Sequence, residues 1–274
     1  VRKRYPGLGI AATPAEVVGT PALDCLYIAS PPASHLAYAH QGFDAGLVVF
    51  CEKPLTVDFA AGRKAIARIE AERRRAAVNF SLASSPGLAA MQAAVRDGSI
   101  GEPKRIEIEL AFDQWPRTWQ SAAGRWLAER AEGGFSREGL SHFVFVLQRA
   151  LGQATVEEAR PDYPADGVSS ERALTARLKA GGVPVAIEAH VGGSHPDFNR
   201  MTLVGSAWAI EIHDWFGLRR HRNDGDWIAE GTAQSNRQIG QAGQLDQLVA
   251  MIEGRAHTLP SFAEALSVQE TIET

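Results

Sequence analysis

Three ionisable side chains have the types and spacing that proton transfer requires. Lys53 lies in the tripeptide Glu52-Lys53-Pro54 and follows an apolar run, residues 47–51, that predicts a buried strand. A lysine at the carboxyl end of a parallel strand lies where open α/β sheets bind ligands. Glu138 and His142 are four residues apart, so a helix over this segment places them on one face, where a carboxylate can steer an imidazole tautomer. Because imidazole titrates near neutral pH, His142 is suited to moving a hydroxyl proton.

The segments around Lys53 alternate between strand and helix over the first 83 residues. Apolar runs predict strands at residues 23–29, 47–51 and 76–81, with helices between them at residues 33–45 and 57–74. This alternation predicts a doubly wound parallel sheet of the Rossmann type. A dinucleotide fold should open with a strand, a G-x-G-x-x-G turn and a helix. Gly7–Ala12 matches that turn only superficially, because no strand precedes it and Pro14 follows. We therefore expect an incomplete sheet whose first βαβ-like segment lies upstream.

From residue 84 the pattern becomes that of an α+β domain. Helices are expected at residues 86–97, 139–151, 239–253 and 261–273. Strands with period-two alternation are expected at residues 105–112, 174–178, 185–191, 201–204 and 208–212. Such runs, joined by Gly, Asp and Asn turns, are typical of an open, mainly antiparallel sheet with one covered face. We therefore expect two domains, residues 1–83 and 84–274.

The composition excludes several classes of function. The chain has 274 residues, 45% hydrophobic and 22% charged, with a formal net charge of -4, which gives no support for binding nucleic acid. No apolar stretch approaches the roughly 20 residues that span a bilayer, and no signal peptide is evident. Cys25 and Cys51 fall inside apolar runs, as expected for reduced core residues of a cytoplasmic protein. The histidines are scattered without zinc-site spacing, so we expect no metal.

An aromatic, arginine-containing segment precedes the Glu138–His142 pair. Trp119 and Trp126 are seven residues apart, which on a helix is one buried face. Their rings can stack on a sugar or a nicotinamide, although packing in the core or between subunits is the simpler explanation for either one. An anionic or polyhydroxylated substrate needs a donor, and Arg137 is the nearest in sequence to the expected site. The other arginines available are Arg117, Arg125 and Arg130.

Two of these segments resemble the Gfo/Idh/MocA family of NAD(P)-dependent oxidoreductases. Residues 28–35 and 51–55 are similar to the family's nicotinamide-side half, and Gly133-Gly134 followed by Glu138 and His142 is similar to its second motif. The resemblance implies an enzyme that transfers hydride between NAD or NADP and a sugar, cyclitol or related polyol. It implies that Lys53 binds the reacting oxygen, that His142 is the acid/base, and that Glu138 orients or contacts substrate.

The same resemblance implies a set of cofactor-binding residues. Ser30, Pro31 and His35 correspond to a small-Pro-x-x-x-His run that lines the family's cofactor cleft. Ser30 would donate to a phosphate or ribose oxygen. His35 has two equal interpretations, a cofactor contact or a residue near a helix N-terminus without a ligand. Glu52 would face the ribose, and the alternative is that it pairs with Lys53.

Two other classes of function stay open at this stage. One is a non-catalytic sensor or scaffold of the same fold, which an absent phosphate loop would favour because that loop supplies much of the dinucleotide affinity. The other is a net non-redox reaction, in which nicotinamide supports an oxidation, elimination and reduction cycle on a glycoside. The resemblance to the family further implies that residues 1–83 bind the dinucleotide and that residues 84–274 bind substrate and form oligomer contacts. A homodimer or homotetramer is expected, because an uncovered apolar face of the second sheet needs a partner.

Overall fold

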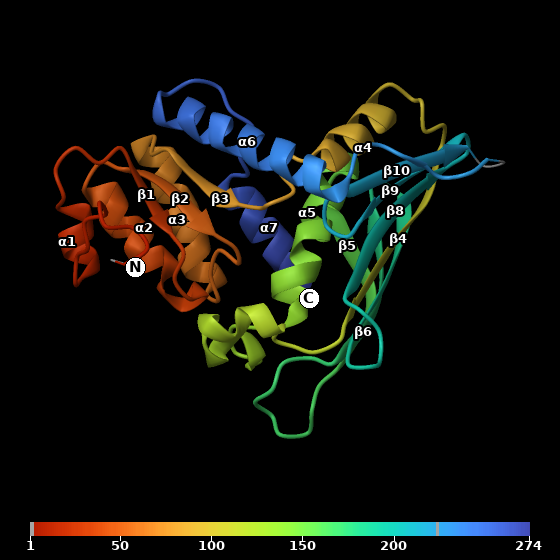
Figure 1. Ribbon diagram of the computed structural model, residues 1–274, viewed down its shortest axis with the longest axis horizontal. Coiled ribbons are helices and arrows are strands. Elements are labelled where there is room, and N and C mark those ends of the chain that lie inside the picture. Colours follow the sequence, from red (N-terminus) through yellow and green to blue (C-terminus); the bar gives the residue numbers. More distant parts are fainter. Residues whose placement is uncertain (1–2, 223–224) are drawn as a thin grey trace.

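The first domain is built on a short parallel sheet. The computed structural model describes residues 3–222 and 225–274 and shows the chain as two sheets with helices between and around them (Figure 1). Strands β1 (Cys25–Ile28), β2 (Val48–Glu52) and β3 (Ala76–Asn79) pair in parallel in the order β1-β2-β3. Helices α2 (His35–Asp44) and α3 (Phe59–Glu72) make the connections, and α1 (Pro14–Val18) and η1 (Pro32–Ser34) precede them. The alternation predicted from the apolar runs is confirmed.

The ends of the connecting helices differ from the expected ranges by a few residues, for local reasons. Asp58 has an extended backbone and its side chain accepts a hydrogen bond from the Ala61 N–H group, so α3 starts after it rather than at residue 57. Arg73 adopts a left-handed conformation with φ of 52°, which ends α3 before Arg74. These caps fix where the chain turns back toward β3.

The second domain is a mixed eight-stranded sheet in the order β11-β10-β9-β8-β4-β7-β6-β5. Its strands are β4 (Pro103–Phe112), β5 (Ala154–Asp162), β6 (Ala173–Ala180), β7 (Val183–Val191), β8 (Phe198–Gly205), β9 (Trp208–His213), β10 (Gly217–Arg222) and β11 (Ile228–Ala229). The β4–β7 pair is parallel and the other pairs are antiparallel, so the predicted mainly antiparallel sheet is confirmed.

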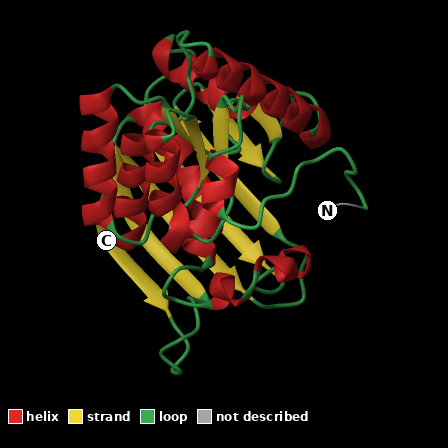
Figure 2. Cartoon of the chain, turned by 90° about the vertical axis from the view of Figure 1, so that its left-hand side faces the viewer, coloured by secondary structure: helices red, strands yellow, loops and turns green. Residues whose placement is uncertain are grey.

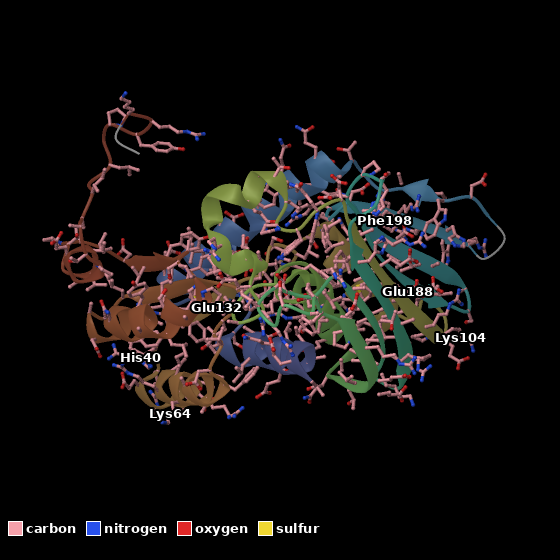
Figure 3. All side chains as sticks on the ribbon, turned by 90° about the horizontal axis from the view of Figure 1, so that it is seen from below. His40, Lys64, Lys104, Glu132, Glu188 and Phe198 are labelled. Carbon is pink, nitrogen blue, oxygen red and sulfur yellow. The ribbon has the colours of Figure 1, made fainter. Side chains whose placement is uncertain are left out.

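One face of this sheet is covered by helices and the other is open (Figure 2). In β7, Val185, Ile187 and Ala189 are buried, whereas the alternating positions are exposed, as a strand with one covered face requires. Figure 3 labels Lys104 and Glu188 on this sheet, and both are exposed and charged. Helix α5 (Ser141–Leu151) packs between the two sheets, and its residues 141–147 are all buried. Helix α4 (Pro86–Arg96) packs against α5 and against β9 and β10 of the second sheet.

The last two helices, α6 (Ala233–Ile252) and α7 (Phe262–Glu273), complete the first domain as well as the second. Val78 in β3 donates its N–H group to the carbonyl oxygen of Pro260 at 2.8 Å. Met251 and Leu259 form a buried cluster with side chains on β2 and β3, namely Val48, Phe50 and Ala77. The first sheet is therefore covered by residues that lie near the other end of the sequence.

Three expectations from composition concern membrane spans, metal sites and the two cysteines. Within residues 3–222 and 225–274, no helix is long and apolar enough to cross a membrane. In the same part of the chain, no group of three or more His, Cys, Asp or Glu side chains is arranged to hold a metal ion. Cys25 and Cys51 are both free thiols, and burial raises the pKa of the Cys51 thiol.

The contact between Gln269 and Thr56 yields a test of the role of α7. The buried Gln269 amide donates to the carbonyl oxygen of Thr56 and accepts from its N–H group at 3.3 Å. Gln269→Leu keeps the side-chain volume but leaves the N–H and carbonyl groups of Thr56 buried without partners. We therefore expect the free energy of unfolding in urea to fall by about 1–3 kcal/mol. Gln238→Leu, at an exposed position on α6, is the control and should change stability by less than about 0.5 kcal/mol. Equal stability of the two variants would contradict this role.

Candidate functional site

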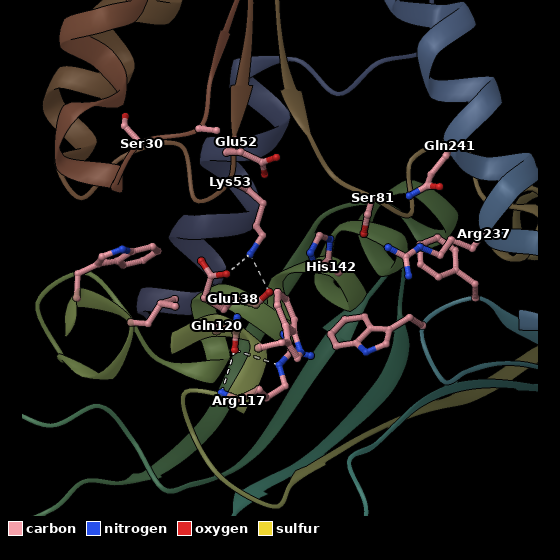
Figure 4. Close-up of a pocket in the computed structure, with 16 residues that line it drawn as sticks. Ser30, Glu52, Lys53, Ser81, Arg117, Gln120, Glu138, His142, Arg237 and Gln241 are labelled. Atoms are coloured by element: carbon pink, nitrogen blue, oxygen red, sulfur yellow. Dashed lines mark hydrogen bonds and ion pairs between the residues drawn. The ribbon is translucent and has the colours of Figure 1, made fainter. Parts of the chain in front are cut away.

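A cavity of about 520 Å³ lies at the carboxyl ends of β1–β3 and opens toward the second sheet (Figure 4). Its volume is in the range of sites that bind small molecules. The residues that line it come from both domains and include Ser30, Glu52, Lys53, Ser81, Arg117, Trp119, Gln120, Trp126, Glu138, His142, Trp215, Arg237 and Gln241. Parallel strands end at this edge, which is where open α/β sheets bind ligands.

Lys53 and Glu138 form a buried ion pair that joins the two domains. The Lys53 ammonium donates to the Glu138 carboxylate at 2.7 Å and to the Glu138 carbonyl oxygen at 2.8 Å. The two side chains are only 8% and 13% exposed. Removing either partner would leave a charge in a desolvated site, so the pair holds the end of β2 against the segment that begins α5.

His142 is buried beside this pair and is uncharged. Its imidazole contacts the edges of Phe80 and Trp215, each at a centroid distance of 5.8 Å. Burial lowers the pKa of His142 well below its ordinary value, and the positive charges of Lys53 and Arg117 lower it further. Nδ1 of His142 is buried and has no hydrogen-bond partner among the described residues. A neutral imidazole in this position can accept a proton from a bound hydroxyl group.

The structure changes one interpretation of the Glu138–His142 spacing. Both side chains line the same cavity, as expected, but the Glu138 carboxylate bonds Lys53 and forms no hydrogen bond with His142 among the described residues. Glu138 lies in a single π-helical turn, η4 (Ser136–Leu140), whereas His142 lies in α5, so the two residues do not share one α-helix. Such turns inside helices occur frequently at functional sites. Glu138 therefore positions Lys53 and does not orient the imidazole.

The glycine pair before this turn is required by close packing. A side chain at Gly133 would overlap the carbonyl oxygens of Trp126 and Leu127. Gly134 has a φ of 106°, and a side chain there would overlap the carboxylate of Glu171. That buried carboxylate accepts a hydrogen bond from the Ser136 N–H group at 2.7 Å. The pair thus lets the chain approach Glu171 closely enough to fix the start of the helical segment that carries Glu138.

The expected cofactor-side residues lie on the wall of the cavity made by the first domain. Ser30 follows β1, and Figure 4 shows it with Glu52 on the side opposite Arg117. The Glu52 carboxylate accepts a hydrogen bond from the Tyr27 phenol and another from the Asn79 amide at 2.7 Å. Glu52 is therefore held by neighbours on β1 and β3 and does not pair with Lys53. Polar groups on all three strand ends fit the nicotinamide–ribose end of a dinucleotide.

Pro31 and His35 are not among the residues that line this cavity. Nδ1 of the buried His35 lies 2.9 Å from the carbonyl oxygen of Pro54, and Nε2 lies 2.7 Å from that of Ser30. The ring therefore ties the loop after β1 to the loop that carries Lys53. Of the two interpretations of His35, the described contacts place it between two loops, where it positions their backbones.

The structure places the expected substrate-side residues differently from the sequence interpretation. Arg137 does not line the cavity: its guanidinium bonds the Glu273 carboxylate and the carbonyl oxygens of Arg130 and Gly133. Trp119 and Trp126 do line the cavity, but the expectation of one buried helical face is wrong. They lie on separate 3₁₀ turns, η2 (Thr118–Ala123) and η3 (Arg125–Ala128), divided by Gly124, and Trp119 is 72% exposed.

Trp215 is a site residue for which the sequence carries no evident signal. It lies in the turn between β9 and β10, where Asp214 and Trp215 have φ of 46° and 66°. Positive φ is rare for such residues, and structures retain it where surrounding contacts impose it. Here the Asn199 side chain accepts the Trp215 N–H group at 2.7 Å, and the ring stacks on Phe143. The strained turn therefore holds an indole against His142.

The fold and the cavity together define a two-domain oxidoreductase architecture, with a dinucleotide-binding sheet facing an open mixed sheet. Residues 5–80 match the Gfo/Idh/MocA oxidoreductase family, whose description is an NAD-binding Rossmann fold. The first domain is therefore an NAD-binding Rossmann domain of this oxidoreductase family.

Individual relatives agree with this assignment. An inositol 2-dehydrogenase of Saccharopolyspora erythraea is 33% identical over 214 residues, which are 73% of this chain and 58% of that protein. The chain spans little more than half the length of the curated relatives it matches. An oxidoreductase of Thermotoga maritima shares the fold with a TM-score of 0.81 at 17% identity, over 99% of this chain and 81% of that one. A 3-ketoreductase of Actinomadura kijaniata, solved with NADP, shares it with a TM-score of 0.79 at 17% identity, over 99% and 83%.

Comparing Gly134→Ala with Gly152→Ala tests the packing of the glycine pair. Both glycines have similar positive φ, 106° and 97°, but a side chain at Gly152 meets nothing within 4 Å. Both variants should lose about 1–3 kcal/mol of stability from the backbone conformation. Gly134→Ala should lose more, because the Glu171 carboxylate must move from Ser136. Equal losses of the free energy of unfolding in urea would show that the close contact between Gly134 and Glu171 does not contribute to stability.

The uncharged state of His142 predicts a pH dependence of stability. The pKa of His142 is lower in the folded chain than in the unfolded chain, so protons bind the unfolded chain more tightly. The stabilisation is complete above the ordinary value of about 6.5 and is lost as the pH falls below it, by up to about 1.4 kcal/mol per pH unit. His142→Gln should lose less stability than the wild type between about pH 8 and pH 5.5 in urea titrations. Parallel curves for the two proteins would contradict this.

Proposed function

We propose that this chain is an NAD(P)-dependent oxidoreductase that acts on a CH–OH carbon of a sugar, cyclitol or related polyol. The observation that carries the proposal is the convergence of Lys53, Glu138 and His142 in one cavity at the edge of the dinucleotide-binding sheet. The S. erythraea relative is named an inositol 2-dehydrogenase, which supports a polyol substrate.

Oxidation of a CH–OH group removes a hydride from the carbon and a proton from the hydroxyl oxygen. Nicotinamide, when bound, supplies the hydride acceptor. Lys53 donates a hydrogen bond to the reacting oxygen and so favours the carbonyl that forms. Glu138 holds the Lys53 ammonium in place through its carboxylate. His142 accepts the hydroxyl proton, for which its uncharged state prepares it. In the reverse direction, the reduction of the carbonyl, His142 returns the proton to the oxygen and Lys53 donates the same hydrogen bond.

The polar groups of the first domain have a different task in this proposal. Glu52, held by Tyr27 and Asn79, accepts hydrogen bonds from a ribose, and Ser30 donates to an oxygen of the dinucleotide. His35 sets the separation of the Ser30 and Pro54 backbones and thus the position of Lys53.

Replacing Lys53 tests the assignment. We expect Lys53→Ala to lower kcat at least about a hundredfold for any polyol that the wild type oxidises with NAD or NADP. The measurement is the rate of reduced-nicotinamide formation across a panel of cyclitols, hexoses and sugar acids. Lys64→Ala is the control, because Lys64 is exposed on the outer side of α3 (Figure 3), and it should keep wild-type rates.

Full activity of a folded Lys53→Ala protein would refute the catalytic role of Lys53. Binding of dinucleotide or sugar by the wild type, without turnover of any substrate in the panel, would instead favour the non-catalytic sensor or scaffold. Hydrolysis of a glycoside without net change in cofactor oxidation state would indicate the oxidation, elimination and reduction cycle.

A further inference from the structure

Arg117 is a cation on the substrate side of the cavity that forms no ion pair among the described residues. Its guanidinium lies against four aromatic rings, at 4.7 Å from the centroid of Trp119 and 5.3–5.5 Å from those of Phe112, Trp115 and Trp215. Its Nε donates to the side-chain oxygen of the buried Gln120 at 3.1 Å. The rings and this hydrogen bond fix the plane of the guanidinium at the cavity wall.

No carboxylate among the described residues pairs with Arg117. The carboxylates that act on its charge are those of Asp197 and Glu138, and the Glu138 carboxylate is bonded to Lys53 at 2.7 Å. The contacts of the Arg117 side chain among the described residues are with aromatic rings and with Gln120. Burial lowers the pKa of Arg117, although the negative charges of Asp197 and Glu138 act in the opposite direction. A guanidinium nevertheless stays charged in proteins.

The cavity as a whole carries one positive charge in excess. The described residues that line it include three cations, Lys53, Arg117 and Arg237, and two carboxylates, Glu52 and Glu138. The excess lies away from the dinucleotide side, because Figure 4 shows Ser30 and Glu52 at one end of the cavity and Arg117 at the other. A ligand group placed beside Arg117 therefore belongs to the substrate.

We infer that Arg117 binds a carboxylate of the substrate, so that the protein acts on a sugar acid rather than on a neutral polyol. The inference rests on the proposed function and narrows its substrate class. With Nε committed to Gln120, the two terminal nitrogens remain, and their spacing matches two carboxylate oxygens. A carboxylate on the substrate supplies the ion-pair partner that Arg117 lacks among the described residues. The indole of Trp119 beside it offers a face for the sugar ring.

Matched pairs of sugars test the inference by binding, without turnover. D-glucuronate and D-glucose differ in the carboxylate at C6, and D-galacturonate and D-galactose give the same comparison in another configuration. We expect the wild type to bind the acid of at least one pair about ten- to a hundredfold more tightly than its neutral partner in ligand-observed NMR titrations. Arg117→Met should bring that ratio of Kd values close to one. Arg125→Met is the control, because Arg125 is 93% exposed on the same segment, and it should keep the wild-type ratio.

Each other outcome overturns the inference. If the wild type binds both acids no more tightly than their neutral partners, the inference is wrong. It is also wrong if Arg117→Met keeps the wild-type ratio of Kd values. If Arg117→Met does not fold, as judged by circular dichroism, Arg117→Lys keeps the charge but loses the paired nitrogens, and its ratio should lie between one and the wild-type value. A ratio unchanged in Arg117→Lys would refute recognition by the planar group. Failure of the proposed function would appear separately, as acid-selective binding without formation of reduced nicotinamide.

Discussion

The ion pair between Lys53 and Glu138 is the constraint on which the rest of the site depends. Two charges leave water to form it, and its geometry offsets that cost through a second hydrogen bond, from Lys53 to the Glu138 carbonyl oxygen. That bond needs the backbone of Glu138, and therefore the π-helical turn, at a fixed distance from the end of β2. The glycine pair and Glu171 place the turn, and His35 places the loop of Lys53. The relative position of the domains is thus set where the chemistry is proposed to occur.

The same pair separates the electrostatic roles of its neighbours. Glu138 compensates the charge of Lys53, whereas the positive potential of Lys53 and Arg117 acts on His142, which has no hydrogen-bond partner at Nδ1 among the described residues. A cation that donates hydrogen bonds and a neutral base can therefore stand side by side in one desolvated cavity. Groups whose surroundings push their protonation states apart are what acid–base chemistry at neutral pH requires.

The features that could be predicted from the sequence are those that depend on the local order of residues along the chain. Apolar runs located β1–β3, and the position of Lys53 after β2 predicted its place at the cavity, because the strand itself aims the next residues at the sheet edge. Spacing misled where it assumed a continuous helix: Gly124 separates Trp119 from Trp126. Proximity in sequence misled for Arg137, whose partner Glu273 lies on α7. Trp215 reaches His142 only through the pairing of β9 with β10, a contact that no local pattern encodes.

The late position of α6 and α7 in the chain has a consequence for how the protein is made. Val48, Phe50 and Ala77 leave the ribosome long before Met251 and Leu259, the side chains that cover them. Until the last helices emerge, the nascent first domain exposes an apolar sheet face and lacks the Pro260 carbonyl that pairs with Val78. Domains near the N-terminus commonly fold during synthesis, and exposed faces of this kind are where chaperones and aggregation compete. Here the sheet of β1–β3 must wait for the segment from Met251 to Pro260 before it can close.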